Sequence, residues 1–310
     1  MSTLGAVSVE AGPTSIITAR SADLGGADAV RRALPFRTRR TVGSWCFLDH
    51  FGPVPMASGA MAIGPHPHIG LQTVTWLLDG ELLHLDSIGS RQVIRRDQLN
   101  LMTSGSGISH AEVSVVRDGA PDGNLHGLQL WLALPSGARE LEPAFAHHPV
   151  LPVVERAGWR ATVVIGRCFG EESPARVHAP LLGLDLAGAG PLDVPVAATF
   201  EHGIYVVDGR LTAAAGERSP AQVVDAGQMI VFERGVDRLR IDSSVPTQAF
   251  LLGGEPFPGP IHMWWNFVAG SREVLEQAVT DWNEGERFGI VLGSGLRRVL
   301  APRPAWLSPG

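Results

Sequence analysis

A pair of similar segments about 130 residues apart constrains the fold of this chain more than any other feature. Residues 77–82 read LLDGEL and residues 206–211 read VVDGRL, an offset of 129. Residues 97–105 and 227–235 also match, at an offset of 130. Two matched segments at nearly one offset predict a duplicated unit, and such a duplication decides the architecture of the whole chain.

Each copy has the pattern of β structure. Short apolar runs alternate with breaks, and glycine and proline together supply 37 and 23 of the 310 residues. Strands are predicted over residues 73–78 and 127–132, each closed by a turn signal. Strands at roughly 8–12-residue spacing are typical of sandwiches and barrels. The sequence therefore predicts an all-β chain with two tandem barrels.

The predicted boundaries follow the prolines and one helical pattern. The first barrel is expected over 15–142, the second over 152–290, with a linker between them and a C-terminal tail over 291–310. Residues 1–14 are expected to be a loose tail. One helix is predicted after Ser271, a capping residue, and before Gly285. Its apolar face is formed by Val274, Leu275, Ala278, Val279 and Trp282.

Composition excludes several classes of function. The net charge is −6 and the chain has no lysine, which argues against a general nucleic-acid binder and excludes a Schiff-base lysine. No apolar stretch of about 18 residues predicts a membrane span, and no signal peptide is expected. Cys46 and Cys168 are too few for a disulfide framework, so two buried thiols and a cytoplasmic location are expected.

Two pairs of side chains with the same spacing carry the strongest chemical signal. His66 and His68 flank one proline, and His110 and Glu112 flank one alanine. Side chains at i and i+2 of a strand point to the same face. If both segments face one barrel interior, three imidazoles and one carboxylate converge, which suits a divalent transition metal with open positions. Fe²⁺ is expected first, while manganese, nickel, copper and zinc stay open.

The second copy serves as an internal control. At the offsets of the repeat, the four positions become Pro195, Ala197, Arg240 and Asp242. The second copy thus keeps the frame without the donor set, so a barrel of this kind does not itself require those four residues. The second barrel is expected to be free of metal.

Several motifs together resemble the pirin family of the cupin superfamily. They are LDHFGP at 48–53, HPHIG at 66–70, LLDG at 77–80, GSGISHAE at 105–112 and HGLQLW at 126–131. The resemblance covers residues from about 20 to 290. It implies two tandem cupin barrels of jelly-roll type, with one iron in the first barrel and none in the second.

The resemblance also implies ligands and a pocket. The metal ligands would be His66, His68, His110 and Glu112. Many cupins carry a glutamate four residues after the second histidine, where this chain has Gln72, so one acid fewer is expected near the pocket. Residues expected to line or support the pocket are Asp49, His50 and Gln129, with His126 as a candidate support for a ligand.

Two functions follow from the resemblance. The first is a mononuclear iron dioxygenase of the quercetin 2,3-dioxygenase type, which opens a flavonol with O2, with Glu112 as both ligand and general base. The alternative is a redox-sensing regulator without turnover, whose iron biases the binding of transcription factors or metabolic enzymes. A third hypothesis is another cupin activity, such as a metal-dependent isomerase acting on a small molecule. No direct contact with nucleic acid or membrane is expected.

Overall fold

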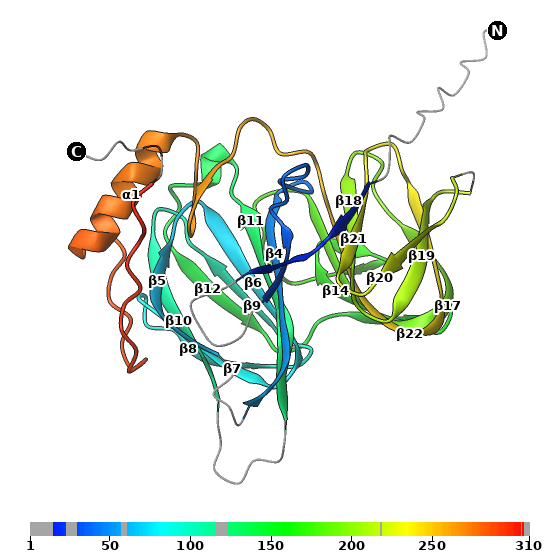
Figure 1. Ribbon diagram of the computed structural model, residues 1–310, viewed down its shortest axis with the longest axis horizontal. Coiled ribbons are helices and arrows are strands. Elements are labelled where there is room, and N and C mark those ends of the chain that lie inside the picture. Colours follow the sequence, from blue (N-terminus) through cyan, green and yellow to red (C-terminus); the bar gives the residue numbers. More distant parts are fainter. Residues whose placement is uncertain are drawn as a thin grey trace, which may run out of the picture.

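The fold consists of two β-barrels side by side, with one helix at the outer edge of the first (Figure 1). The computed structural model describes residues 15–22, 30–56, 61–115, 123–217, 219–304 and 306. Within them the chain is almost entirely strands, and the prediction of an all-β chain with two barrels and a short C-terminal helix is confirmed.

The first barrel is built from two facing sheets. The larger has seven strands in the order β12 (Ala144–His148), β9 (Leu99–Thr103), β6 (Leu71–Asp79), β11 (Asn124–Ala133), β4 (Trp45–Pro55), β3 (Val30–Leu34) and β2 (Arg20–Ala22). The smaller has four, in the order β5 (Ala62–His68), β10 (Ile108–Ser114), β7 (Glu81–Asp86) and β8 (Arg91–Arg95). Neighbouring strands in both sheets are antiparallel.

The second barrel is a single nine-stranded sheet. Its strands are β1 (Ser15–Thr18), β13 (Val153–Arg156), β14 (Trp159–Ile165), β17 (Leu181–Pro195), β18 (Glu201–Asp208), β19 (Arg210–Ala215), β20 (Gln222–Asp225), β21 (Gln228–Phe232) and β22 (Arg238–Gly254). Two short hairpins, β15 (Arg167–Cys168) with β16 (Glu171–Glu172) and β23 (His262–Trp264) with β24 (Phe267–Ala269), lie outside these sheets.

The duplicated sequence forms the same hairpin twice. Asp79 and Gly80 turn β6 into β7, and Asp208 and Gly209 turn β18 into β19. Both glycines have φ near +80°, at 85° and 80°, a conformation that side chains with a Cβ rarely adopt. The repeat found in the sequence is therefore a structural repeat.

A shared apolar core joins the barrels. It includes Trp45, Trp76 and Leu130 of the first barrel with Tyr205 and Phe250 of the second. Trp45 meets Phe250 edge to face, with ring centroids 6.1 Å apart, and its Nε1 donates to the carbonyl of Gly253 at 3.0 Å. The outer face of the large sheet is thereby buried, so the interior of the first barrel is left for the candidate site.

The sheets depart from the predicted boundaries at three places. β1 belongs to the second barrel, since it pairs with β21. β12 lies in the predicted linker yet extends the first barrel by pairing with β9. β24 and α1 (Arg272–Glu284) fall in the range predicted for the second barrel, yet pack on the first around Ile69.

The helix begins and ends where the sequence predicts. Ser271 is its N-cap, and Gly285 ends it with φ 86°. Its buried face is formed by Leu275, Ala278, Val279 and Trp282, whereas Val274, predicted on that face, is 42% exposed. Beyond the helix, the predicted tail lies against the first barrel: the amide of Val299 donates to the carbonyl of Pro65 at 2.9 Å.

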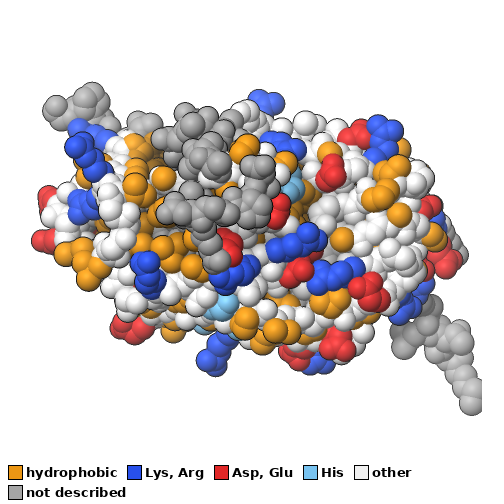
Figure 2. Space-filling model, turned by 90° about the horizontal axis from the view of Figure 1, so that it is seen from below, with side chains coloured by type: hydrophobic (Ala, Val, Ile, Leu, Met, Phe, Trp, Pro, Cys, Tyr) orange, Lys and Arg blue, Asp and Glu red, His pale blue; other side chains and the backbone are white. Residues whose placement is uncertain are grey.

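The surface and the thiols agree with the composition. Arginine and acidic side chains are interspersed over the face seen in Figure 2. Cys46 and Cys168 are both buried and unpaired, as predicted. Among the described helices, none has the length and apolar character needed to cross a bilayer. The first 14 residues lie outside the described part of the chain.

Candidate metal centre

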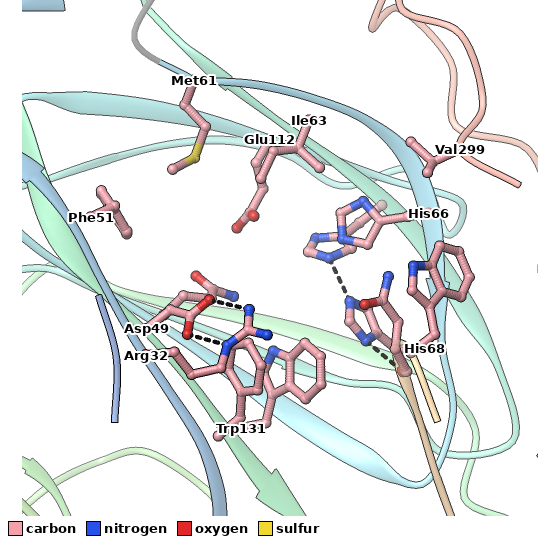
Figure 3. A pocket seen from close by; sticks show the side chains of 15 residues that line it. Arg32, Asp49, Phe51, Met61, Ile63, His66, His68, Glu112, Trp131 and Val299 are labelled. Atoms are coloured by element: carbon pink, nitrogen blue, oxygen red, sulfur yellow. Dashed lines mark hydrogen bonds and ion pairs between the residues drawn. The ribbon is translucent and has the colours of Figure 1, made fainter. Parts of the chain in front are cut away.

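Two neighbouring strands of the small sheet carry the four predicted donors. His66 and His68 lie on β5, and His110 and Glu112 lie on β10. In the antiparallel register, His110 lies directly opposite His66, so side chains distant in sequence become neighbours. All four residues are buried. The alternation of strand side chains thus brings both pairs to the barrel interior (Figure 3).

Three imidazoles form a tight cluster. His68 Nε2 lies 3.0 Å from His110 Nε2, and the ring centroids of His66 and His110 are 4.3 Å apart. One nitrogen from each of the three rings lies within 4.8 Å of the others. Three nitrogen atoms this close can bind one ion together.

Backbone carbonyls orient two of these rings. His66 Nδ1 lies 2.9 Å from the carbonyl oxygen of Gly64, and His68 Nδ1 lies 3.0 Å from that of Asn266. A carbonyl oxygen only accepts, so both Nδ1 atoms carry the proton, and both Nε2 atoms present lone pairs. Such partners behind a ligating histidine fix its tautomer and ring orientation.

Burial keeps the imidazoles neutral, as metal ligation requires. Burial lowers the pKa of His66 to about 4. Burial, reinforced by the neighbouring histidines, also lowers the pKa values of His68 and His110 well below the ordinary value. The donor set therefore fits a divalent cation: unprotonated nitrogens meet in a dry interior with nothing but a cation suited to lie between them.

Glu112 stands slightly apart from this cluster. Its carboxylate belongs to a second trio with His84 and His110, again within 4.8 Å, and accepts a hydrogen bond from Thr75 Oγ1 at 3.4 Å. Figure 3 shows the carboxylate in the same cavity, pointing in from β10. Burial raises its pKa. Glu112 thus faces the site as a group that binds a proton more readily than an exposed glutamate does.

His84 is the residue that the sequence analysis missed. It lies on β7, directly opposite Glu112, and its ring Nδ1 is 3.4 Å from His110 Nδ1. A signal for it was present, because His84 and Asp86 repeat the i, i+2 spacing of the other two pairs.

A cavity of about 310 Å³ opens beside the donors, between the two sheets. One wall is aromatic: the rings of Phe47 and Trp131 stack with centroids 3.9 Å apart. The guanidinium of Arg32 lies over Phe47, 4.5 Å from the ring centroid, and makes a bidentate ion pair with Asp49. The cavity thus combines metal-type donors, a flat apolar wall and one paired charge (Figure 3).

The residues expected around the pocket are divided by the geometry. Asp49 and Gln129 line the cavity. His50 does not, and that expectation is wrong: as the next residue of β4, it points to the opposite face, where its Nδ1 lies 3.0 Å from Tyr205 Oη of the second barrel. His126 contacts His50, with the two Nε2 atoms 2.7 Å apart, and supports no predicted ligand.

Gln72 also lies outside the cavity lining. Its side-chain amide donates to Thr103 Oγ1 at 2.9 Å and to the carbonyl of Arg176 at 3.1 Å. The substitution of glutamine for the glutamate of many cupins therefore serves packing in this chain and leaves the donor cluster unchanged.

The second barrel fills the corresponding positions with apolar side chains. Strand pairing carries the hairpin offset of 129 through β22, so His110 and Glu112 correspond to Leu239 and Ile241. His66, opposite His110, corresponds to Val194, opposite Leu239. The positions expected from the sequence, Arg240 and Asp242, are one residue off and exposed. All three apolar residues lie in the core of the second barrel.

Comparison with known protein families accounts for both barrels. The model of the pirin family matches residues 27–132, and that of the pirin C-terminal cupin domain matches residues 181–289. The chain belongs to the pirin family. The resemblance inferred from the motifs is thereby confirmed, as are the two tandem cupin barrels.

Individual pirins resemble the chain along almost all of its length. A protein of Pseudomonas aeruginosa named "putative quercetin 2,3-dioxygenase" is 42% identical, over 94% of this chain and 90% of its own. A pirin-like protein of Caulobacter vibrioides is 38% identical, over 87% and 93%. The crystal structure of a quercetin 2,3-dioxygenase from Acinetobacter baumannii superposes with a TM-score of 0.87 at 41% identity, covering 95% of this chain and 97% of that one.

Proposed function

We propose that this pirin is a metal-dependent dioxygenase that cleaves flavonols of the quercetin type with O2, and that the native metal is Fe²⁺. The observation that carries the proposal is the cluster of three neutral imidazoles and one carboxylate at the edge of a cavity with an aromatic wall. Two relatives whose names specify quercetin 2,3-dioxygenase support the choice of substrate.

His66, His68, His110 and Glu112 would hold the metal. A bound divalent iron would supply open coordination positions and the electron transfer that O2 chemistry needs. Imidazole and carboxylate ligands also suit manganese, nickel, copper or zinc, so ligand type alone does not fix the choice. Fe²⁺ is proposed because three histidines and a carboxylate with open positions match non-haem iron.

Glu112 would be the general base. A flavonol must lose the proton of its hydroxyl group to react, and a carboxylate within hydrogen-bond reach can accept it. Burial of Glu112 raises its pKa, which strengthens it as a base, and the hydroxyl of Thr75 stabilises the charged form. Glu112 thus has two roles, and its proton moves only when substrate is present.

The wall opposite the small sheet would orient the substrate. Phe47 and Trp131 offer flat apolar surface suited to a planar aromatic ring. Arg32, at the same wall, offers a cationic donor for a substrate oxygen. The cavity excludes most water, so these interactions act in a medium of low dielectric constant.

Turnover of quercetin in air tests the proposal. Protein loaded with Fe²⁺ under reducing conditions should consume the flavonol absorbance and release carbon monoxide. Glu112→Gln, which keeps the size of the side chain but not its basicity, should lose at least about 100-fold in kcat/KM. Elemental analysis and electron paramagnetic resonance of the protein from its own host would identify the metal.

The regulator hypothesis is the outcome to expect if turnover fails. With stoichiometric metal confirmed, a rate no higher than that of free iron would exclude the enzyme. Partner capture under reducing and oxidising conditions would then test the alternative, and partners that do not depend on the state of the metal would count against it.

A further inference from the structure

Next to His110, outside the lining of the cavity, a histidine and an aspartate form a chain of polar groups. His84 Nδ1 lies 3.4 Å from His110 Nδ1, and His84 Nε2 lies 3.1 Å from Asp86 Oδ2. His84 and Asp86 are 3% and 4% exposed. Buried polar groups of this kind need partners, and here they have each other.

Asp86 is itself fixed by the backbone. Its Oδ1 accepts hydrogen bonds from the amides of Ile88 at 3.1 Å and Ser90 at 2.8 Å. Oδ2 is left to face His84, and a carboxylate only accepts, so His84 Nε2 carries the proton. Phe145 stacks on the ring of His84, with centroids 4.4 Å apart and planes at 14°, which fixes the ring plane.

This arrangement determines the state of His110. With the proton of neutral His84 on Nε2, its Nδ1 is an acceptor, so His110 Nδ1 must donate to it. His110 Nε2 then has no proton and presents a lone pair toward His68 Nε2, 3.0 Å away. His66 and His68 obtain the same orientation from backbone carbonyls, whereas His110 obtains it from a side chain.

The second barrel indicates that the fold does not require these polar residues. By the same strand pairing, His84 corresponds to Ala213 and Asp86 to Ala215, both buried. The barrel that has apolar residues at the ligand positions therefore also has them at the positions of His84 and Asp86. The two sets of residues occur together in one barrel and are absent together from the described positions of the other.

We propose that His84, held by Asp86, is a positioning residue that fixes the Nδ1–H tautomer of His110 and so presents Nε2 as a metal ligand. The inference rests on the metal site of the proposed function but not on turnover of a flavonol. An orienting partner behind a ligand is typically worth about 10–100-fold in metal affinity.

Histidine tautomers in the metal-free protein give the first test. With ¹⁵N-labelled histidine, two-bond ¹H–¹⁵N spectra distinguish the tautomers of each neutral ring. The expected result is Nδ1–H for His110 and Nε2–H for His84. Finding His110 as the Nε2–H tautomer in the wild-type protein would overturn the proposal.

Two substitutions at one position give the second test. His84→Phe keeps the volume but removes the acceptor, and should convert His110 to a mixture of tautomers and lower Co²⁺ affinity about 10–100-fold in chelator competition. His84→Asn keeps an acceptor atom near the Nδ1 position and should retain the His110 tautomer and most of the affinity. Equal losses in both variants would contradict a positioning role.

The same titration tests whether His84 is itself a ligand. Wild-type protein should bind one Co²⁺ per chain, and the ligand-field spectrum of the His84→Asn complex should match it. A second bound Co²⁺, or a spectrum altered by loss of one nitrogen ligand, would assign His84 to the ligand set and overturn the proposal. If His84→Phe fails to fold, the wild-type tautomers and His84→Asn still decide. Absence of quercetin turnover would leave all of these readouts unchanged.

Discussion

Arg32 Nε and Nη2 each lie 2.7 Å from a different carboxylate oxygen of Asp49. The pair spans two adjacent strands, β3 and β4, where the two residues lie opposite each other. The side chain of Asp49 is 2% exposed and that of Arg32 is 20% exposed. The carboxylate therefore depends on the guanidinium far more than the guanidinium depends on the carboxylate.

Removing one partner at a time should show this asymmetry. Arg32→Met leaves a buried carboxylate unpaired and should lower the free energy of unfolding by about 3–5 kcal/mol. Asp49→Asn keeps an acceptor beside a partly exposed arginine and should cost only about 1–2 kcal/mol. Urea denaturation measures both. The double variant Arg32→Met/Asp49→Leu should be more stable than Arg32→Met alone, and the opposite order would refute this account.

Metal should stabilise the protein through the histidine cluster. An ion that binds the folded chain at 100 times its Kd adds about 2.7 kcal/mol, visible as a rise in Tm. His66→Ala removes one of three converging nitrogens and should abolish both metal retention and the rise in Tm. His178→Ala, in the second barrel, is the matched control and should retain both. A His66→Ala protein with a full complement of metal would show that the site is assigned wrongly.

Asp185 should make stability depend on pH. Burial, with a contribution from the charge of Asp97, raises its pKa to about 7, although a hydrogen bond from Gln248 lowers it. In the unfolded chain the same carboxyl has a pKa near 3.8. Between about pH 4 and pH 7 the folded protein holds a proton that the unfolded chain has lost, so stability falls as pH rises through this window.

Asp185→Asn removes that dependence. The variant should match the wild-type protein near pH 4 and exceed it near pH 8 by up to about 4 kcal/mol in the free energy of unfolding. Urea denaturation at pH 4, 6 and 8 provides the comparison. Asp193→Asn, at an exposed position of the same strand, should show no such trend. A constant difference between Asp185→Asn and wild type at all three pH values would contradict the prediction.

Gly64 should control how the C-terminal segment closes the cavity. A Cβ at this position would lie 2.1 Å from the carbonyl oxygen of Arg297, and Val299, two residues on, lines the cavity. Gly64→Ala should displace this segment and speed tryptic cleavage after Arg297 and Arg298. Gly137→Ala, where nothing lies within 4 Å of an added Cβ, is the control. Unchanged cleavage in Gly64→Ala would show that the segment does not depend on this contact.

The sequence predicted the donor cluster because its logic is local. The spacing of His66 and His68, and of His110 and Glu112, fixes which face of a strand each pair shares. His84 was missed because its approach to His110 depends on the register between β7 and β10, which joins residues 26 positions apart. No local pattern encodes that register.

The errors have physical causes as well. The offset of 130 at β21 returns to 129 at β22, and a shift of one residue moves every side chain of a strand to its other face. Arg240 and Asp242 were therefore placed where Leu239 and Ile241 belong. His50 was assigned to the cavity because the face of β4 that meets the second barrel is set by tertiary packing against Tyr205.

The crossing of β1 has a consequence for how the molecule is assembled. Ser15 pairs with Val231, more than 200 residues later. During synthesis this segment emerges first, yet its partner strand is among the last to be made, so it must wait without a neighbour until nearly the whole polypeptide exists. The two halves are then tied by a clasp at the amino end, and neither is a unit that a truncated gene could be expected to deliver intact.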